Sequence, residues 1–403
     1  MQTTESAVPT EDYLPTAAEG WPVFEQDEID AVVDVLRSGK VNQWTGDRVR
    51  AFEAAYEQYV GAGHAIALAN GSVSLELALR AFGIGPGDEV VVTPRTFVAS
   101  AFCVMLVGAT PVFADVDRDS GNITPQTVRA VLTERTKAII PVHLAGWPVD
   151  MPGFLELAEE HDLFVIEDCA QAHGAEIGGR PVGAWGHAAS FSFCQDKIMS
   201  TGGEGGLVLF RDRAHYDWAW SYKDHGKNAA KAFDRDAPPG FRWLHDSVGT
   251  NWRMLESSAA IGLRQLAKLD AWRAARTRNA AIWADALRDV PGVRIPAPTD
   301  DVVHAQYKFY VYVDGDAADG RPLRDHVIDA LAATGVPGLS GSCSEVYLEE
   351  AFTDMDVPTQ PVAAELGRTS LMFLVHPTLD PDRLRRRAGV VADAIRSVTA
   401  AHG

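Results

Sequence analysis

One lysine stands where an apolar strand gives way to a glycine-dense turn. Residues 190–197 read SFSFCQDK and end at Lys197, and four glycines follow between positions 202 and 206. Glycines adopt unusual backbone angles and let the chain approach a ligand closely. A lysine that is partly desolvated in such a turn becomes a nucleophile or a Schiff-base former. A solvated loop lysine is the ordinary alternative, and the strand and the glycines argue against it.

Two further strand ends carry polar side chains. Residues 164–167 predict a strand that runs into Asp168, and a carboxylate there can ligate a metal, act as a base, pair with a cofactor's pyridinium nitrogen or cap the next turn. Residues 70–74, NGSVS, follow another strand and open a helix. Gly71 and Ser72 then offer free N–H groups to a phosphate, although an ordinary helix cap explains this element equally well.

The order of predicted elements indicates an α/β fold. Short apolar strands alternate with amphipathic helices from residue 65 to 210, as in a parallel sheet covered on both faces. The ligand of such a sheet lies beyond the carboxyl ends of the strands, where the residues above stand. A helix is expected at 26–38, a strand at 190–194, and one or two long helices at about 255–289.

We therefore expect three regions along the chain. Residues 1–20 form a segment that is mobile or lies against a partner subunit, residues 21–255 form a large α/β domain, and residues 256–403 form connecting helices and a small α+β domain.

Composition narrows the classes of function. The chain has 36 basic and 55 acidic residues and a formal charge of −19, which argues against a nucleic-acid partner. Its four cysteines form no metal-binding pair and are expected as reduced thiols. No run approaches the roughly 20 apolar residues of a membrane span, and no secretory leader pattern is present. These features predict a cytoplasmic protein with no membrane partner.

Five motifs in one order carry a resemblance to a known family. NGSVS, TPRTFVAS, EDCAQAHGA, SFSFCQDKIMSTGGEGG and TNWRM follow one another, and the likeness covers roughly residues 20–380. In this order they resemble the sugar aminotransferases of the DegT–StrS group, which are fold type I enzymes dependent on pyridoxal 5′-phosphate (PLP). The resemblance implies that fold for the large domain. It also implies that Lys197 forms the Schiff base and that Asp168 pairs with the pyridine nitrogen.

The same resemblance implies further site residues. Phe97 stacks on the cofactor ring, Gln171 lies near the ring and its hydroxyl, and the phosphate is held by Gly71, Ser72 and Ser192. Asn251 matches a residue that reaches the neighbouring subunit's cofactor phosphate, which implies a homodimer with shared active sites. From the residues themselves, Phe97 is equally explained as a core aromatic. Strand alternation places Ser192 on one face with Ser190 and Cys194, a face that should meet something polar.

The implied reaction moves an amino group from glutamate or glutamine to a keto sugar in two ping-pong stages, with Lys197 also transferring the proton. The acceptor expected is a nucleotide-linked 4-keto-6-deoxyhexose or its 3-keto isomer. A keto-cyclitol aminotransferase and a cofactor-binding regulatory protein without turnover remain alternatives. Four basic residues either bind the diphosphate or form a solvated surface, namely Lys223, Lys227, Arg242 and Arg253. Three histidines are either site-edge or packed residues: His143, His304 and His376.

Overall fold

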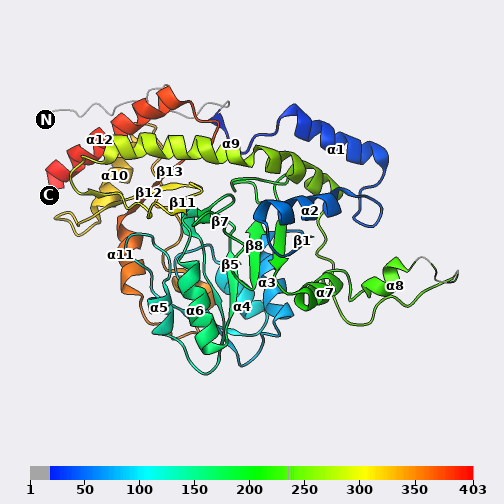
Figure 1. The fold of residues 1–403 in the computed structure, drawn as a ribbon. Coiled ribbons are helices and arrows are strands. Elements are labelled where there is room, and N and C mark those ends of the chain that lie inside the picture. Colours follow the sequence, from blue (N-terminus) through cyan, green and yellow to red (C-terminus); the bar gives the residue numbers. More distant parts are fainter. Residues whose placement is uncertain (1–18, 235, 237, 239, 403) are drawn as a thin grey trace.

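Two sheets of different size organise the chain. The computed structural model describes residues 19–402 except 235, 237 and 239, so residues 1–18 of the expected N-terminal segment lie outside the described part. A larger part with a mainly parallel sheet and a smaller part with an antiparallel sheet lie side by side (Figure 1). Helix α9 (Glu256–Leu287) runs along both parts as one continuous element, where the sequence predicted one or two helices.

The larger sheet has seven strands in the order β1-β9-β8-β5-β4-β2-β3. Strand β9 is antiparallel to both of its neighbours, and the other six strands run in one direction. The predicted α/β fold with a mainly parallel sheet is therefore confirmed. The strands are β1 (His64–Leu68), β9 (Gly206–Phe210), β8 (Ala188–Ser192), β5 (Phe164–Asp168), β4 (Thr136–Ile140), β2 (Glu89–Val92) and β3 (Thr110–Phe113).

Helices cover both faces of this sheet, so its strands are buried on both sides. Along β1, Ile66 and Leu68 pack into the core that includes helix α3, whereas Ala65 and Ala67 pack into the core that includes α2. This two-sided burial explains why the strands read as continuous apolar runs. The helices of this part are α1 (Gln26–Ser38), α2 (Arg48–Val60), α3 (Gly71–Ala81), α4 (Ala99–Leu106), α5 (Pro125–Arg129), α6 (Met151–His161) and α7 (Arg213–Tyr222).

The smaller part is built on an antiparallel sheet of β10 (Val293–Arg294), β12 (Phe309–Val313) and β13 (Ser370–Phe373). It is covered by α10 (Leu323–Ala332), α11 (Pro361–Thr369) and α12 (Pro381–His402), and α12 packs on α9. The two parts also share a third sheet, in which β11 (Val302–Val303) pairs with β6 (Glu176–Ile177), and β6 with β7 (Arg180–Pro181). Short 3₁₀ turns are η3 (Leu144–Gly146), which follows β4 in the larger part, and η4 (Val346–Leu348) and η5 (Glu350–Phe352), whose buried residues pack against the core of the larger part.

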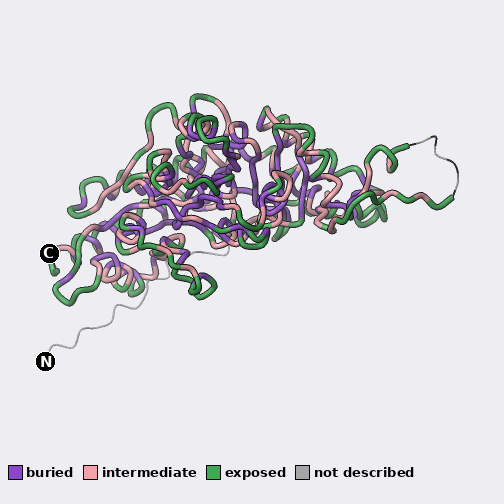
Figure 2. The backbone as a smooth tube through the Cα atoms, turned by 90° about the horizontal axis from the view of Figure 1, so that it is seen from below, coloured by how far each residue is buried: buried purple, intermediate pink, exposed green. Residues whose placement is uncertain are grey.

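One segment departs from the body of the molecule. The described residues between 225 and 250, which include the short helix α8 (Ala229–Phe233), project from the end of the larger part (Figures 1 and 2). We call this segment the arm. Among the described residues, no helix is long and apolar enough to cross a bilayer.

The strand that leads to Lys197 ends earlier than predicted. Strand β8 covers Ala188–Ser192, not residues 190–194, because its neighbour β9 begins at Gly206, which pairs with Ser192. Beyond that point Phe193 turns inward, and its carbonyl accepts from the N–H of Thr201. The alternation of serine and phenylalanine predicted which side chains share a face of this strand. It did not predict where the neighbouring strand β9 begins, and that position sets the end of β8.

The crossing of α9 over α2 gives a test of the packing. A side chain at Gly262 would lie 2.8 Å from the ring of Phe52, which is fully buried. Replacing Gly262 by Ala should therefore lower the free energy of unfolding by about 1–3 kcal/mol, because the core cannot take the extra methyl group. Urea unfolding followed by circular dichroism measures the change.

Gly389 supplies the matched control. It is also helical, in α12, but nothing lies within 4 Å of the position that its side chain would take. Gly389→Ala should raise stability by about 0.5–1 kcal/mol, because alanine loses less backbone entropy in a helix. Equal effects of the two substitutions would contradict the packing described.

Candidate active site

The carboxylate of Asp168 is buried at the end of the central strand β5. Its Oδ2 accepts a hydrogen bond from the Ser100 hydroxyl at 2.8 Å, and its Oδ1 accepts from the Ala170 N–H at 3.1 Å. Burial raises the pKa of Asp168, and these two hydrogen bonds and the charge of Lys197 act in the opposite direction. The site thus holds an oriented carboxylate whose ionised form gains from a cationic partner.

Lys197 lies beyond the end of β8, in the turn that the sequence predicted. Its side chain is 14% exposed, and its Nζ lies 4.0 Å from Asp196 and 5.2 Å from the centre of the Tyr307 ring. Burial tends to raise the pKa of Asp196, but the charge of Lys197 and the Tyr307 hydroxyl outweigh it and lower that pKa. The indole N–H of Trp21 donates to the Lys197 carbonyl at 2.8 Å and fixes the turn. The amine is thus enclosed and held in place.

The start of helix α3 lies against the end of β8. A side chain on Gly71 would come within 2.7 Å of the Cβ of Ser192, so only glycine allows this approach. Asn70 caps the helix by accepting from the Val73 N–H, while the N–H groups of Gly71 and Ser72 have no partner within the helix. Ser72 is exposed and the hydroxyl of Ser192 faces Gly71, so the three predicted phosphate ligands lie together.

The serine face of β8 meets a polar neighbour, as predicted. The hydroxyls of Ser190 and Ser74 are hydrogen-bonded to each other, which ties β8 to the first turn of α3. Behind Ser192, the buried His173 donates from Nε2 to the Ser192 carbonyl at 2.9 Å and accepts at Nδ1 from Tyr56 at 2.8 Å. Burial lowers the pKa of His173 to about 4, so this histidine is neutral. Its role is to position Ser192.

Gln171 is held by a strained loop. Its Oε1 accepts the N–H of Ala145 at 2.7 Å, and Ala145 has a φ of 58°, in the left-handed region. The same loop joins the two parts of the chain, because the Ala145 carbonyl accepts from the N–H of Tyr307 at 2.9 Å. A non-glycine residue in this conformation costs about 1–3 kcal/mol, and such strain gathers at functional sites.

Two predicted residues are placed differently from the others. Phe97 is 66% exposed, which excludes the core-aromatic interpretation and leaves its ring available to a ligand. Asn251 is also exposed, but it lies at the base of the arm and pairs through its backbone with Asp224. No contact among the described residues joins Asn251 to Lys197 or Asp168 of its own chain.

Several residues of the site were not assigned a role from sequence. Ser100 and His173 stand in the quoted motifs, but only the packing shows that they orient Asp168 and Ser192. Trp21 precedes the first helix and gave no signal. His143, in contrast, is a packed residue, because it is fully buried and binds the Val149 N–H and the Glu167 carboxylate.

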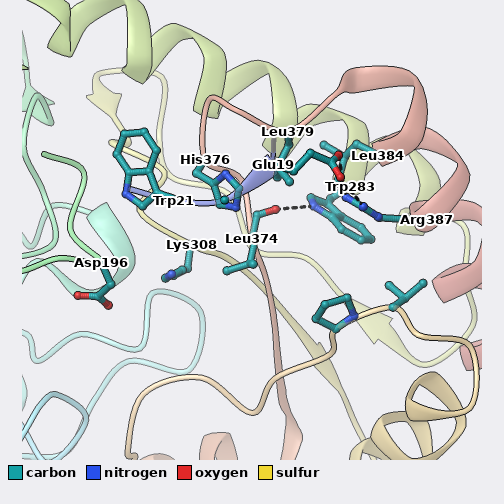
Figure 3. Close-up of a pocket in the computed structure, with 13 residues that line it drawn as sticks. Glu19, Trp21, Asp196, Trp283, Lys308, Leu374, His376, Leu379, Leu384 and Arg387 are labelled. Atoms are coloured by element: carbon teal, nitrogen blue, oxygen red, sulfur yellow. Dashed lines mark hydrogen bonds and ion pairs between the residues drawn. The ribbon is translucent and has the colours of Figure 1, made fainter. Parts of the chain in front are cut away.

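A cavity of about 240 Å³ lies between the two parts of the chain (Figure 3). Trp21, Asp196, Lys308 and His376 line it, and Trp21 and His376 stack with ring centres 6.2 Å apart. Lys308 has a pKa lowered to about 8, because burial disfavours its charge. This cavity therefore reaches Asp196, the neighbour of Lys197, from the side of the smaller part.

These groups fit PLP. A glycine-lined helix start suits its phosphate, an oriented buried carboxylate suits its ring nitrogen, and an enclosed lysine suits its aldehyde. The decisive observation is the close approach of Gly71 to Ser192, since a side chain on Gly71 would come within 2.7 Å of the Ser192 Cβ and force the helix start away from it.

The family model of the DegT/DnrJ/EryC1/StrS aminotransferases matches residues 22–392. The chain belongs to this family. Its members are PLP-dependent, and this chain is a PLP-dependent aminotransferase. The resemblance noted in the sequence is thereby confirmed.

Three similar proteins illustrate the match. The spore coat polysaccharide biosynthesis protein SpsC of Bacillus subtilis is 38% identical over 93% of this chain and 96% of its own. A dTDP-3-amino-3,4,6-trideoxy-alpha-D-glucose transaminase of Streptomyces venezuelae is 34% identical over 91% of this chain and 90% of its own. An aminotransferase from Psychrobacter cryohalolentis, known from its crystal structure, is 50% identical in sequence. Its structure matches 95% of this chain and 99% of its own with a TM-score of 0.89.

Because α3 and β8 lie so close together, adding one methyl group at Gly71 should weaken the binding of the cofactor. Gly71→Ala should weaken PLP binding about tenfold or more, because the added Cβ pushes the helix start away from Ser192. Titration of the cofactor-free protein with PLP, followed by absorbance, measures the affinity. Gly85→Ala is the control, since its side chain would meet only ordinary contact at 3.6 Å, and it should leave the affinity unchanged.

Proposed function

We propose that this enzyme transfers an amino group from glutamate or glutamine to a keto sugar, namely a nucleotide-linked 4-keto-6-deoxyhexose or its 3-keto isomer. The observation that carries the proposal is the placement of Lys197 and Asp168 at one edge of the sheet, with the charge of the lysine acting on the buried carboxylate. The reaction runs in two half-reactions, first with the donor and then with the acceptor.

Each residue has a separate task in this proposal. Bound PLP supplies an electron-withdrawing ring that stabilises negative charge at the carbon that loses its proton. Asp168, oriented by Ser100, holds a proton at the ring nitrogen. Lys197 Nζ would take the proton from the α-carbon of the donor as a base and deliver it to C4′ of the cofactor as an acid. Phe97, Gln171, Ser72 and Ser192 bind and orient the cofactor.

The acceptor class rests on the relatives. The Streptomyces relative is named for a dTDP-linked 3-amino sugar, which supports a nucleotide-linked acceptor and, of the two isomers, the 3-keto one. The basic residues considered for its diphosphate are engaged within the chain. Arg253 and Lys227 contact the buried Asp224 at 2.6 and 3.3 Å, and the buried Lys223 donates to Gln43 at 2.7 Å. A solvated basic surface is thus excluded for Lys223.

The arm supports a homodimer with shared active sites. Large apolar side chains gather on it with exposed fractions of 57% for Phe233, 81% for Phe241, 80% for Trp243 and 90% for Val248. Such a concentration of exposed apolar surface is typical of a protein contact. A second copy of the chain covers this surface in the proposal, and Asn251 at the arm's base reaches the partner's cofactor phosphate.

The reaction is tested by removal of Lys197. Lys197→Ala and Lys197→Arg should abolish transamination, because neither side chain both binds the cofactor covalently and moves the proton. Borohydride treatment should fix PLP to the peptide that contains Lys197 in the wild type and leave the variants unlabelled in mass spectrometry. Full turnover in either variant would refute the assignment.

The acceptor is identified in the same preparation. Glutamate should remove the visible absorption of the lysine-bound cofactor, and a keto-sugar nucleotide should restore it. Restoration by a keto-cyclitol alone, with no competition from nucleoside diphosphates, would select the cyclitol alternative. An absorption band that neither glutamate nor glutamine changes would favour the regulatory alternative.

Shared active sites predict complementation between two inactive variants. Lys197→Ala and Asn251→Ala should each be nearly inactive alone, since each damages both sites of its dimer. A mixed dimer contains one site with both native residues and should regain activity after subunit exchange. Sedimentation measures the assembly, and mixing without any recovery would place Asn251 outside the partner's site.

A further inference from the structure

Arg95 is a buried cation without a hydrogen-bonding partner. It lies between β2 and α4, it is 0% exposed, and none of its three guanidinium nitrogens has a hydrogen bond in the described part of the chain. Only its backbone N–H is engaged, by the Thr93 hydroxyl at 3.2 Å. Buried charges in proteins are normally paired, since an isolated one costs several kcal/mol.

Two tyrosine rings stabilise this charge in part. The guanidinium carbon of Arg95 lies 5.3 Å from the centre of the Tyr310 ring and 5.6 Å from that of Tyr312. A cation–π contact favours the charge but offers no oxygen to the N–H groups. Arg294 contacts the same Tyr312 ring at 4.3 Å, yet it is paired with Asp119 at 2.9 Å. Arg95 is thus the member of this pair that lacks an anion.

Arg95 is one of the residues that line a cavity of about 270 Å³. The walls are mostly apolar and come from both parts of the chain, among them Leu144, Trp147, Ala280 and Ile295. The volume is below the about 300–1,000 Å³ of pockets that hold a whole drug-sized ligand. The cavity therefore suits one end of a substrate.

Two further donors face this cavity. Lys308 lines it and has no ion pair within 4 Å among the described residues. His304 accepts the Gln306 N–H at Nδ1, so its proton stands on Nε2, and burial lowers the pKa of His304 to about 3 and keeps it neutral. The one carboxylate among the lining residues, Asp119, is paired with Arg294 at 2.9 Å, so Arg95 and Lys308 leave the cavity locally positive within a chain of charge −19.

The cavity adjoins the active site. Ala145 lines it, and the N–H of Ala145 is bound by Gln171, which we place beside the cofactor ring. Lys308 also lines the cavity that contains Asp196, next to Lys197 (Figure 3). An anion on Arg95 therefore belongs to a molecule that reaches the reacting centre.

We propose that this cavity is a carboxylate subsite, in which Arg95 binds a carboxylate of a substrate through two of its N–H groups, with Lys308 as a second cation. The planar fork of a guanidinium matches a carboxylate in this way, and apolar walls strengthen the pair. The inference rests on the proposed function. The carboxylate belongs either to the amino donor or to an acid group on the acceptor sugar.

The test measures binding to the holoenzyme without turnover. Glutarate stands for the donor and glucuronate for an acidic sugar, with glutaramide and glucose as their neutral counterparts. Calorimetric titration should detect binding of at least one acid, and Arg95→Met should weaken it about tenfold or more. The neutral counterparts should bind equally to both proteins.

Arg321→Met is the control, because it removes an exposed cation that is paired with Asp329 at 2.9 Å and does not line the cavity, so acid binding should be unchanged. A loss confined to glutarate assigns the subsite to the donor, and a loss confined to glucuronate assigns it to the acceptor. If wild type binds neither acid, or if Arg95→Met binds both as wild type does, the subsite is refuted.

Two measurements keep the outcomes separate. Should Arg95→Met fail to fold, Arg95→Lys retains the charge without the fork, and unchanged affinity for both acids in that variant refutes the bidentate pair. Transamination is read independently from the absorbance change with glutamate. An enzyme that binds an acid through Arg95 but does not transaminate would refute the proposed function and leave the subsite standing.

Discussion

The burial of one carboxylate constrains much of this fold. Asp168 ends β5, the middle strand of the seven-stranded sheet, where an ionised group costs several kcal/mol unless it is hydrogen-bonded and faces a cation. Ser100 from α4 and the Ala170 N–H provide the hydrogen bonds, and Lys197 provides the charge. Strand order, the position of α4 and the turn after β8 must all be correct for this carboxylate to keep these two hydrogen bonds and its cationic neighbour.

A second constraint is close backbone packing where α3 meets β8 and β9. A side chain on Gly206 would lie 2.1 Å from the carbonyl of Asn70, just as one on Gly71 would meet Ser192. These two glycines bring a helix start, with its free N–H groups, to the same sheet edge as Lys197. The start of α3 and the amine of Lys197 are therefore held at one edge of the sheet by these close backbone approaches.

Positive charge is concentrated inside this acidic protein, where the two parts meet. Arg276 is buried, donates to the Tyr307 carbonyl at 3.1 Å and lies 5.0 Å from the centre of the Trp21 ring, and burial lowers its pKa to about 9. Arg95 and Lys308 lie at the same junction. Charges in a low-dielectric region act over longer distances than surface charges, so a few buried cations make this junction locally positive despite the overall charge of −19.

The sequence by itself determined the fold class and the chemistry. Short apolar strands that alternate with amphipathic helices predicted the parallel sheet, and helix α1 has the predicted bounds of 26–38. The motifs around Lys197 and Asp168 predicted the class of cofactor. These features are local, because periodicity and turn residues act over a few positions. Strand β8 ended two residues earlier than predicted, because its limit depends on where β9 begins.

Only the tertiary structure decided which groups surround the reactive ones. Ser100, Trp21 and Lys308 are distant in sequence from Asp168 and Lys197, and their roles follow from strand order and from the contact between the two parts of the chain. The same holds for Arg95, which reads in sequence as one more basic residue in a motif. Whether a cation is paired depends on what packs around it, and this is a property of three-dimensional contacts that no local pattern contains.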